Sequence, residues 1–276
     1  MKDIVFVSAF YDIGRSKWNT KYTRPVESYI DGFIFLANNI TYDLIVFIEE
    51  KYLKRIKSNI IKKNIIFLKI EDYINDLFIK KYYDVNNKII NSRKYKEKVP
   101  EGRKNKPEHT FALYNLINHD KVNFVKISKN LYNNYKYYSW IDFGLIDKVH
   151  HKLKRPEELI PFNINIKYLN ENKVIYQAST KSLMHIDPRI MLSVNEVFIY
   201  GTFWICPNKL VEKFQNIYEN ELILWNNMNI VDDDQSMVFQ LIFKYDIFKL
   251  YYNSNFFALW KVILNMPIDS KIVKSK

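Results

Sequence analysis

Short, unbroken apolar runs alternate with segments of helical spacing over roughly the first seventy residues of the chain. Residues 4–10 and 42–48 are almost continuously apolar and rich in β-branched and aromatic side chains, a pattern typical of strands that are buried on both faces. Residues 65–70 repeat it. Between these runs, residues 25–38 and 52–61 carry apolar side chains at intervals of three and four, which predicts helices. The succession of strand, helix, strand, helix and strand predicts an α/β fold with a mainly parallel central sheet flanked by helices, in which the first two runs are interior strands.

The pattern changes between residues 80 and 106, where lysine, arginine and asparagine dominate. Because no apolar periodicity is evident there, this stretch is predicted to be a long, flexible, basic loop. Such a loop could close over an anionic substrate or form a solvated flap, and the sequence leaves both readings open.

Regular elements return after this stretch. Residues 109–130 have the spacing of one or two helices, and residues 210–225 that of another. Shorter runs predict strands at residues 175–178, 197–200 and 248–252, the second of them ending in a loop at Gly201. No internal repeat or domain boundary is visible, so residues 1–276 are interpreted as a single domain.

One further apolar run, residues 137–141, ends at a single carboxylate, Asp142, followed by Gly144. Aspartate and glycine favour turns, so this run is interpreted as a buried strand whose carboxyl end places Asp142 in a loop. Ligands of α/β sheets bind just beyond such strand ends, and Gly144 would allow close approach of a ligand. Asp142 is therefore either a ligand-binding residue or an ordinary turn residue.

Three consecutive acids, Asp232, Asp233 and Asp234, open the apolar helical run at residues 237–243. One of them could cap the helix, since aspartate accepts bonds from the free N–H groups there. Capping needs only one acid, and adjacent carboxylates repel one another. A site that binds a divalent cation or removes a proton would account for the surplus, and this interpretation is preferred.

Charge and composition narrow the range of functions only slightly. The formal net charge is +12, which suits nucleic acid, anionic lipid or a phosphate-bearing small molecule, although scattered lysines also make an ordinary solvated surface. Cys206 is the only cysteine, so an intrachain disulfide and a thiolate cluster are excluded, and a reducing, cytoplasmic location is expected. No apolar segment is long enough to span a membrane, so the chain is expected to be soluble.

Several motifs in order resemble the HtrL/YibB family. They are residues 8–15 (SAFYDIGR), residues 140–144 (WIDFG), residues 201–204 (GTFW), residues 232–235 (DDDQ) and the region around Lys121. The resemblance covers nearly the whole chain. It implies a fold of the nucleotide-diphosphosugar transferase type, called GT-A, and a glycosyltransferase that moves sugar from a nucleotide-diphosphate sugar to a hydroxyl of a glycan, lipid or protein.

By this resemblance, Asp142 takes the place of the Asp-x-Asp metal motif of such enzymes, and Mn²⁺ or Mg²⁺ is the expected cofactor. The motif here is Asp142-Phe143-Gly144, so its second carboxylate is missing, and Lys121 or Arg15 could share in neutralising the diphosphate. Asp233 or Asp234 would orient the acceptor or remove its proton. The residues expected to contact the donor are Ala9, Phe10, Tyr11, Arg15, Lys121, Asp142, Gly144 and Gly201. His185 and Asp187 form a weaker candidate pair.

Two other classes of function stay open. A nucleic-acid-binding protein would use the positive charge and the tyrosines, but the aromatic residues lie mostly in apolar runs, so no nucleic-acid partner is expected. A metal-dependent phosphoesterase would use Asp142 and the acidic triplet, although two-metal sites usually need more ligands. Peripheral contact with a membrane is left open, as is the oligomeric state.

Overall fold

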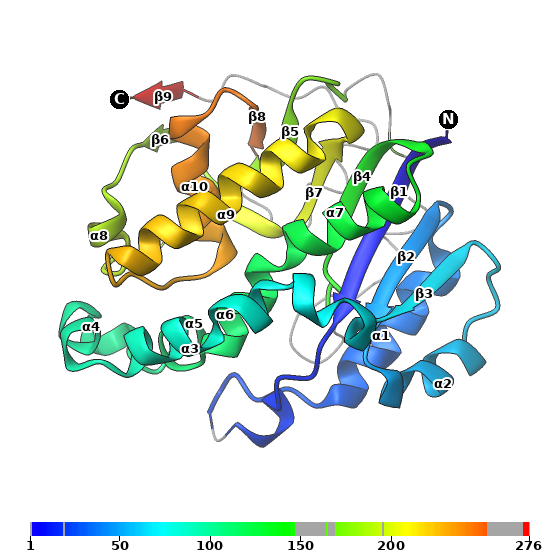
Figure 1. Cartoon of the computed structure of the whole chain (residues 1–276), viewed down its shortest axis with the longest axis horizontal. Helices are drawn as coiled ribbons and strands as arrows, with labels where there is room; N and C mark the ends of the chain where they lie inside the picture. Colours follow the sequence, from blue (N-terminus) through cyan, green and yellow to red (C-terminus); the bar gives the residue numbers. More distant parts are fainter. Residues whose placement is uncertain are drawn as a thin grey trace.

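The computed structural model of the protein contains a central sheet of seven strands in the order β3-β2-β1-β4-β7-β5-β8 (Figure 1). The structure describes residues 2–18, 20–146, 164, 169–194, 196–252 and 273–275. β7 is antiparallel to its neighbours β4 and β5, and every other adjacent pair in this sheet is parallel. The predicted mainly parallel sheet is therefore confirmed, with β1 and β2 as interior strands. The strands are β1 (Lys2–Phe10), β2 (Asp43–Ile48), β3 (Ile65–Lys69), β4 (Tyr135–Ile141), β5 (Val174–Ala178), β7 (Ile199–Pro207) and β8 (Phe248–Tyr252).

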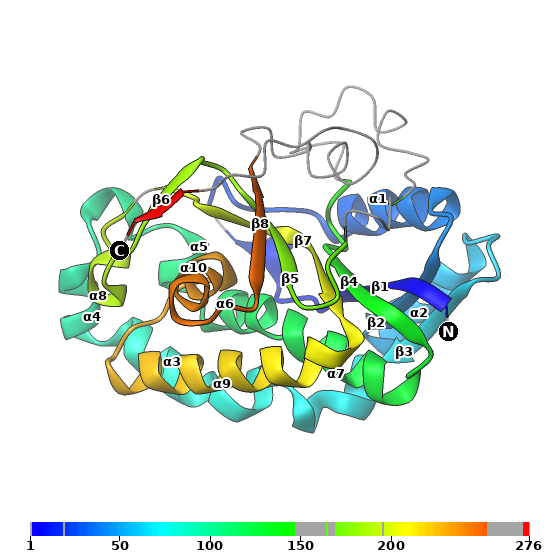
Figure 2. The same ribbon diagram turned by 90° about the horizontal axis from the view of Figure 1, so that it is seen from above.

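Helices cover both faces of this sheet (Figure 2). On one face, α1 (Val26–Asn39) and α2 (Glu50–Ser58) pack against alternate residues of β1 and β2. On the other face lie α7 (Lys121–Leu131), α9 (Val211–Asn227) and α10 (Asp234–Lys244). Successive side chains of a strand point to opposite faces, so a strand covered on both sides must be apolar throughout. This is why the first two apolar runs show no alternation.

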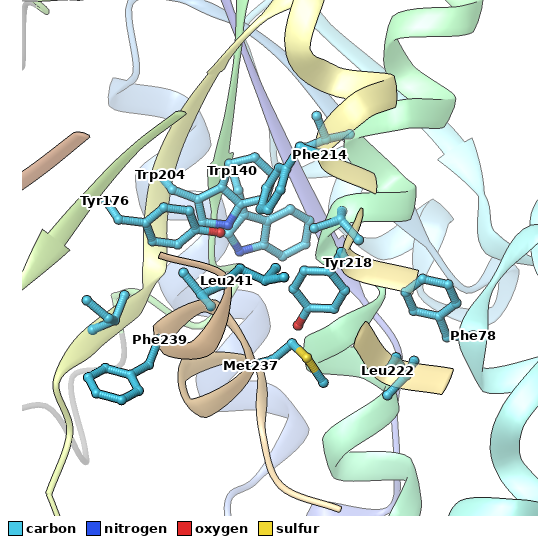
Figure 3. Close-up of a cluster of buried hydrophobic side chains, with 14 of the residues drawn as sticks. Phe78, Trp140, Tyr176, Trp204, Phe214, Tyr218, Leu222, Met237, Phe239 and Leu241 are labelled. Atoms are coloured by element: carbon cyan, nitrogen blue, oxygen red, sulfur yellow. The ribbon is translucent and has the colours of Figure 1, made fainter. Parts of the chain in front are cut away.

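The core between the sheet and helices α9 and α10 is largely aromatic (Figure 3). Trp204 of β7 stacks on Tyr176 of β5 with ring centroids 5.7 Å apart, and meets the edge of Phe214 of α9 at 5.5 Å. Phe214 in turn contacts Tyr218 one turn further along the helix. Each such aromatic pair stabilises the fold by about 0.5–1.5 kcal/mol beyond the stabilisation from burying its apolar area. These rings are packed inside the protein, so they are not stacking platforms for nucleic-acid bases.

The predicted loop between residues 80 and 106 is wrong, because this stretch is mostly helical. It contains α3 (Phe78–Asn91), α4 (Arg93–Lys98) and the 3₁₀ turn η3 (Glu101–Arg103), followed by α5 (Pro107–Thr110) and α6 (Ala112–His119). A sparse apolar face at helical spacing is buried and was hidden among lysines and asparagines: Phe78, Ile79, Ile89, Ile90 and Tyr95. The one or two helices predicted within residues 109–130 are confirmed as α6 and α7.

Shorter elements complete the described chain. They are the 3₁₀ turns η1 (Arg15–Lys17), η2 (Ile70–Asp76) and η6 (Asn208–Leu210), helix α8 (Pro188–Met191), and a parallel pair formed by β6 (Ser182–Met184) and β9 (Val273–Ser275). None of the described helices combines the length and the apolar character that crossing a membrane requires. The predicted turn at Gly201 is wrong, since β7 continues through that residue.

Candidate functional site

The carboxyl ends of β1 and β4 border a cavity of about 270 Å³. Because these strands are parallel neighbours, the loops that follow them leave the same edge of the sheet. The cavity is lined by nine of the predicted site residues: Ala9, Phe10, Tyr11, Arg15, Lys121, Asp142, Gly144, Gly201 and Asp234. Asp233 does not line it. The structure thus brings Asp142 and Asp234, which belong to separate sequence motifs, to one cavity.

Lys121, the first residue of α7, lies at the centre of the site and links its two carboxylates. Its Nζ atom is 2.9 Å from Asp234 Oδ2, 3.2 Å from Asp142 Oδ1 and 3.1 Å from the carbonyl oxygen of Gly201. Only 7% of the side chain is exposed. Burial alone would lower the pKa of Lys121, but the two carboxylates raise it above its ordinary value, so the amine is a fixed ammonium.

Asp142 is positioned by the strand that precedes it. Trp140 and Asp142 are two residues apart, so their side chains point to the same side of the extended chain. The indole Nε1–H of Trp140 donates to Asp142 Oδ1 at 2.6 Å, and the backbone N–H of Asp142 donates to Thr202 of β7 at 2.9 Å. The Asp142 side chain is 26% exposed, so its carboxylate is accessible from the cavity although the buried indole of Trp140 holds it in place.

Asp234 enters the site from the first turn of α10, and Gly201 makes room for it. A methyl group at position 201 would overlap Asp234 Oδ2 and lie 3.0 Å from its Cγ. Glycine inside a strand often marks a close approach of another group, and here that group is the carboxylate. Burial and the nearby negative charge of Asp142 raise the pKa of Asp234, whereas the ammonium of Lys121 lowers it.

The other two acids of the triplet have different roles. Asp233 is the N-cap of α10, where its Oδ1 accepts from the backbone N–H groups of Gln235 and Ser236. Asp232 is buried and accepts from the Ser236 hydroxyl. Both border a separate cavity of about 60 Å³. The structure therefore assigns capping to Asp233, and of the two acids expected to orient the acceptor or remove its proton only Asp234 lines the larger cavity.

Two buried tyrosine–histidine pairs, which were not predicted from the sequence, hold the loop that precedes α10. The hydroxyl of Tyr95 donates to the carbonyl of Val231 at 2.7 Å and lies 2.9 Å from His109 Nδ1. His119 Nε2 lies 3.0 Å from the carbonyl of Asp232. A carbonyl only accepts, so this nitrogen carries a proton, and Nδ1 accepts from the hydroxyl of Tyr218, 2.7 Å away. Burial lowers the pKa of His119 to about 3, which keeps the ring neutral.

The lining of the cavity also carries positive charge from Arg15 and Arg24. Arg15 donates to the hydroxyl of Tyr29 at 2.7 Å and to the carbonyl of Tyr22 at 3.2 Å. Glycine is required at position 144, beside Tyr29, because a Cβ atom there would lie 2.5 Å from the ring of Tyr29. The chain turns before Arg15 at Gly14, whose φ of 74° lies in the left-handed region.

Comparisons with known proteins agree with the motifs. A family model described as "Bacterial protein of unknown function (HtrL_YibB)" matches residues 2–264. The chain belongs to the HtrL_YibB family. No curated protein matches its sequence.

Solved structures similar to this HtrL_YibB chain include the apo form of mouse xyloside xylosyltransferase 1, with 8% identity and a TM-score of 0.43 over 98% of this chain and 96% of that one. Another is the 4-diphosphocytidyl-2C-methyl-D-erythritol synthase of Anaerococcus prevotii, with 13% identity and a TM-score of 0.37 over 91% and 87% of the two chains.

The weaker candidate pair of this HtrL_YibB protein has structural roles. Asp187 caps α8 and pairs with Arg189, whose hydrogen bonds lower the pKa of the carboxyl to about 2. His185 lies 3.2 Å from Gln240 Oε1 and packs against the ring of Phe243. Neither residue lines the cavity.

The described residues do not fit a divalent ion held between the two carboxylates. Among them, no group of three or more His, Cys, Asp or Glu side chains could hold a metal ion. The space between Asp142 and Asp234 contains the ammonium of Lys121, and Oδ1 of Asp142 also accepts from Trp140. The expectation of Mn²⁺ or Mg²⁺ at Asp142 stays a prediction.

Proposed function

We propose that this HtrL_YibB protein is a glycosyltransferase that moves a sugar from a nucleotide-diphosphate sugar to a hydroxyl of a glycan, lipid or protein. One observation carries the proposal. One cavity at the carboxyl ends of parallel strands is lined both by two arginines and by a carboxylate–ammonium–carboxylate cluster. A phosphate-bearing donor suits the arginines, and a reacting hydroxyl suits the carboxylate cluster.

The two arginines would stabilise the leaving group. Breaking the bond between the sugar and the diphosphate leaves negative charge on a phosphate oxygen, which fixed cationic donors stabilise more strongly in the transition state than in the ground state. In the described structure Arg15 uses two of its five N–H donors on Tyr22 and Tyr29. The remaining donors of Arg15, together with Arg24, are available to a diphosphate.

Asp234 is the proposed base for the acceptor. Its carboxylate is buried, which raises its pKa and so strengthens it as a base, while Lys121 fixes its Oδ2. The acceptor hydroxyl transfers its proton to Asp234, and its oxygen forms a bond to the anomeric carbon. The bond from that carbon to the phosphate oxygen breaks, and its electron pair leaves with the nucleoside diphosphate. Asp142, more exposed and held by Trp140, would orient the sugar.

The test is a binding and turnover panel with UDP, GDP, ADP, CDP and their sugar derivatives. At least one nucleoside diphosphate should raise the melting temperature, since a ligand that binds only the folded state stabilises it. Asp142→Asn should lower turnover of the matching nucleotide sugar by at least about 100-fold with little change in melting temperature. Asp187→Asn is the matched control, because that carboxylate lies outside the cavity, and it should retain full activity. Absence of any response across the panel would refute the proposal.

A further inference from the structure

The position between Asp142 and Asp234, where a cation bridging two carboxylates would lie, already contains a positive charge. Three oxygen atoms surround Lys121 Nζ at 2.9–3.2 Å: one from each carboxylate and the carbonyl of Gly201. An ammonium has three N–H donors, so these oxygens match its full donor capacity. They are also oxygens of the type that Mg²⁺ and Mn²⁺ prefer.

The surroundings of Lys121 keep the ammonium in place. Its side chain is 7% exposed and extends from the first turn of α7, whose residues Val122, Phe124 and Val125 are buried in the core. The ring of Trp140, whose centroid is 5.9 Å from Nζ, also borders it. Withdrawal of the ammonium would leave two carboxylates facing one another with little solvent between them, which is strongly unfavourable. A divalent ion beside Asp142 would meet the repulsion of this fixed charge.

We infer that Lys121 is the resident cation of this site and that the donor diphosphate binds without a divalent ion bridging it to Asp142. The part of this inference that concerns the donor rests on the proposed function. The ammonium compensates the carboxylates, and the charge of the diphosphate is met by Arg15 and Arg24, which line the same cavity.

The first test uses MnCl₂ alone, so it does not depend on any nucleotide. Mn²⁺ binding to the full chain is measured by electron paramagnetic resonance in three variants: wild type, Lys121→Ala, and Lys121→Ala combined with Asp142→Asn. Removal of the ammonium frees two carboxylates and a carbonyl for a metal. Lys121→Ala should therefore bind Mn²⁺ at least about tenfold more tightly than wild type, and the double variant should lose this gain. Equal Mn²⁺ binding by wild type and Lys121→Ala would overturn the inference.

The second test uses the wild-type protein and therefore does not require the lysine variant to fold. The affinity for each nucleoside diphosphate of the panel is measured by titration calorimetry in EDTA and in millimolar Mg²⁺ or Mn²⁺. The dissociation constant should differ by less than about twofold between the two buffers. Replacement of Arg15 by alanine should weaken the affinity at least tenfold. Binding that disappears in EDTA and returns with the metal, but not in Asp142→Asn, would overturn the inference. If no nucleotide binds in either buffer, the proposed function fails, and the Mn²⁺ comparison alone decides the role of Lys121.

Discussion

Replacement of Gly201 by alanine should disable the site while leaving the fold intact. The added methyl group would overlap Asp234 Oδ2 and lie 3.0 Å from Asp234 Cγ. Carbon atoms are normally about 3.5–4.0 Å apart at contact, so the carboxylate must move back by roughly 0.5–1 Å. The same oxygen is 2.9 Å from Lys121 Nζ, and this displacement stretches that bond to or beyond the limit of a hydrogen bond.

Two magnitudes follow for Gly201→Ala. Overpacking of a buried position costs about 1–3 kcal/mol of stability, which lowers the melting temperature by several degrees without unfolding the protein. A catalytic group displaced by up to about 1 Å can lose about 100-fold in rate. The loss of turnover should therefore be much larger than the loss of stability would suggest.

The assay combines urea denaturation with turnover of the nucleotide sugar. Gly102→Ala is the matched control, because a methyl group there meets no atom within 4 Å, and it should behave as wild type. A double-mutant cycle isolates the mechanism. In an Asp234→Ala background the methyl group has no carboxylate to displace, so Gly201→Ala should then cost little further stability. An equal loss of stability from Gly201→Ala in the wild-type and Asp234→Ala backgrounds, or full activity of Gly201→Ala, would refute the reasoning.

Three further predictions concern stability and ligand class. Asp120→Ala should lower the free energy of unfolding by about 2–4 kcal/mol, because the Asp120 carboxylate accepts from the backbone N–H groups of Phe78 and Ile79 at 2.6 and 3.0 Å. In the same urea assay, Asp84→Ala on the exposed side of α3 should lower it by less than about 0.5 kcal/mol. Burial lowers the pKa of His119 to about 3, so between about pH 6.5 and 3 the unfolded chain binds a proton that the folded protein does not. The free energy of unfolding should therefore fall on acidification by up to about 1.4 kcal/mol per pH unit. His119→Gln should flatten this slope in urea titrations from pH 7 to 4.5. Nucleoside diphosphate binding should survive a salt series that abolishes any oligonucleotide binding, because only a polyphosphate strand releases many counterions; tight oligonucleotide binding that resists salt would contradict this.

The sheet could be predicted because its strands are encoded locally. Residues 4–10, 42–48 and 248–252 are short apolar runs, and the structure confirms each as a strand within two residues of the predicted bounds. The helices between residues 78 and 110 could not be recognised in this way. Their apolar positions are sparse, and α3 is capped by Asp120, a residue 42 positions from Phe78 in the sequence. A cap supplied by tertiary contact leaves no local signal.

The same distinction explains the site. Asp142 was identifiable because strand, carboxylate and glycine are adjacent in the sequence. The division of labour within the acidic triplet was not, because it depends on which carboxylate meets the ammonium of Lys121 and which meets the end of α10. Gly201 shows the limit most clearly. Its sequence neighbours suggest a turn, yet the glycine lies inside a strand, and its function is the space it leaves for a side chain 33 residues away. The catalytic proposal therefore depends less on the individual motifs than on their convergence on one lysine, a contact that only the folded chain supplies.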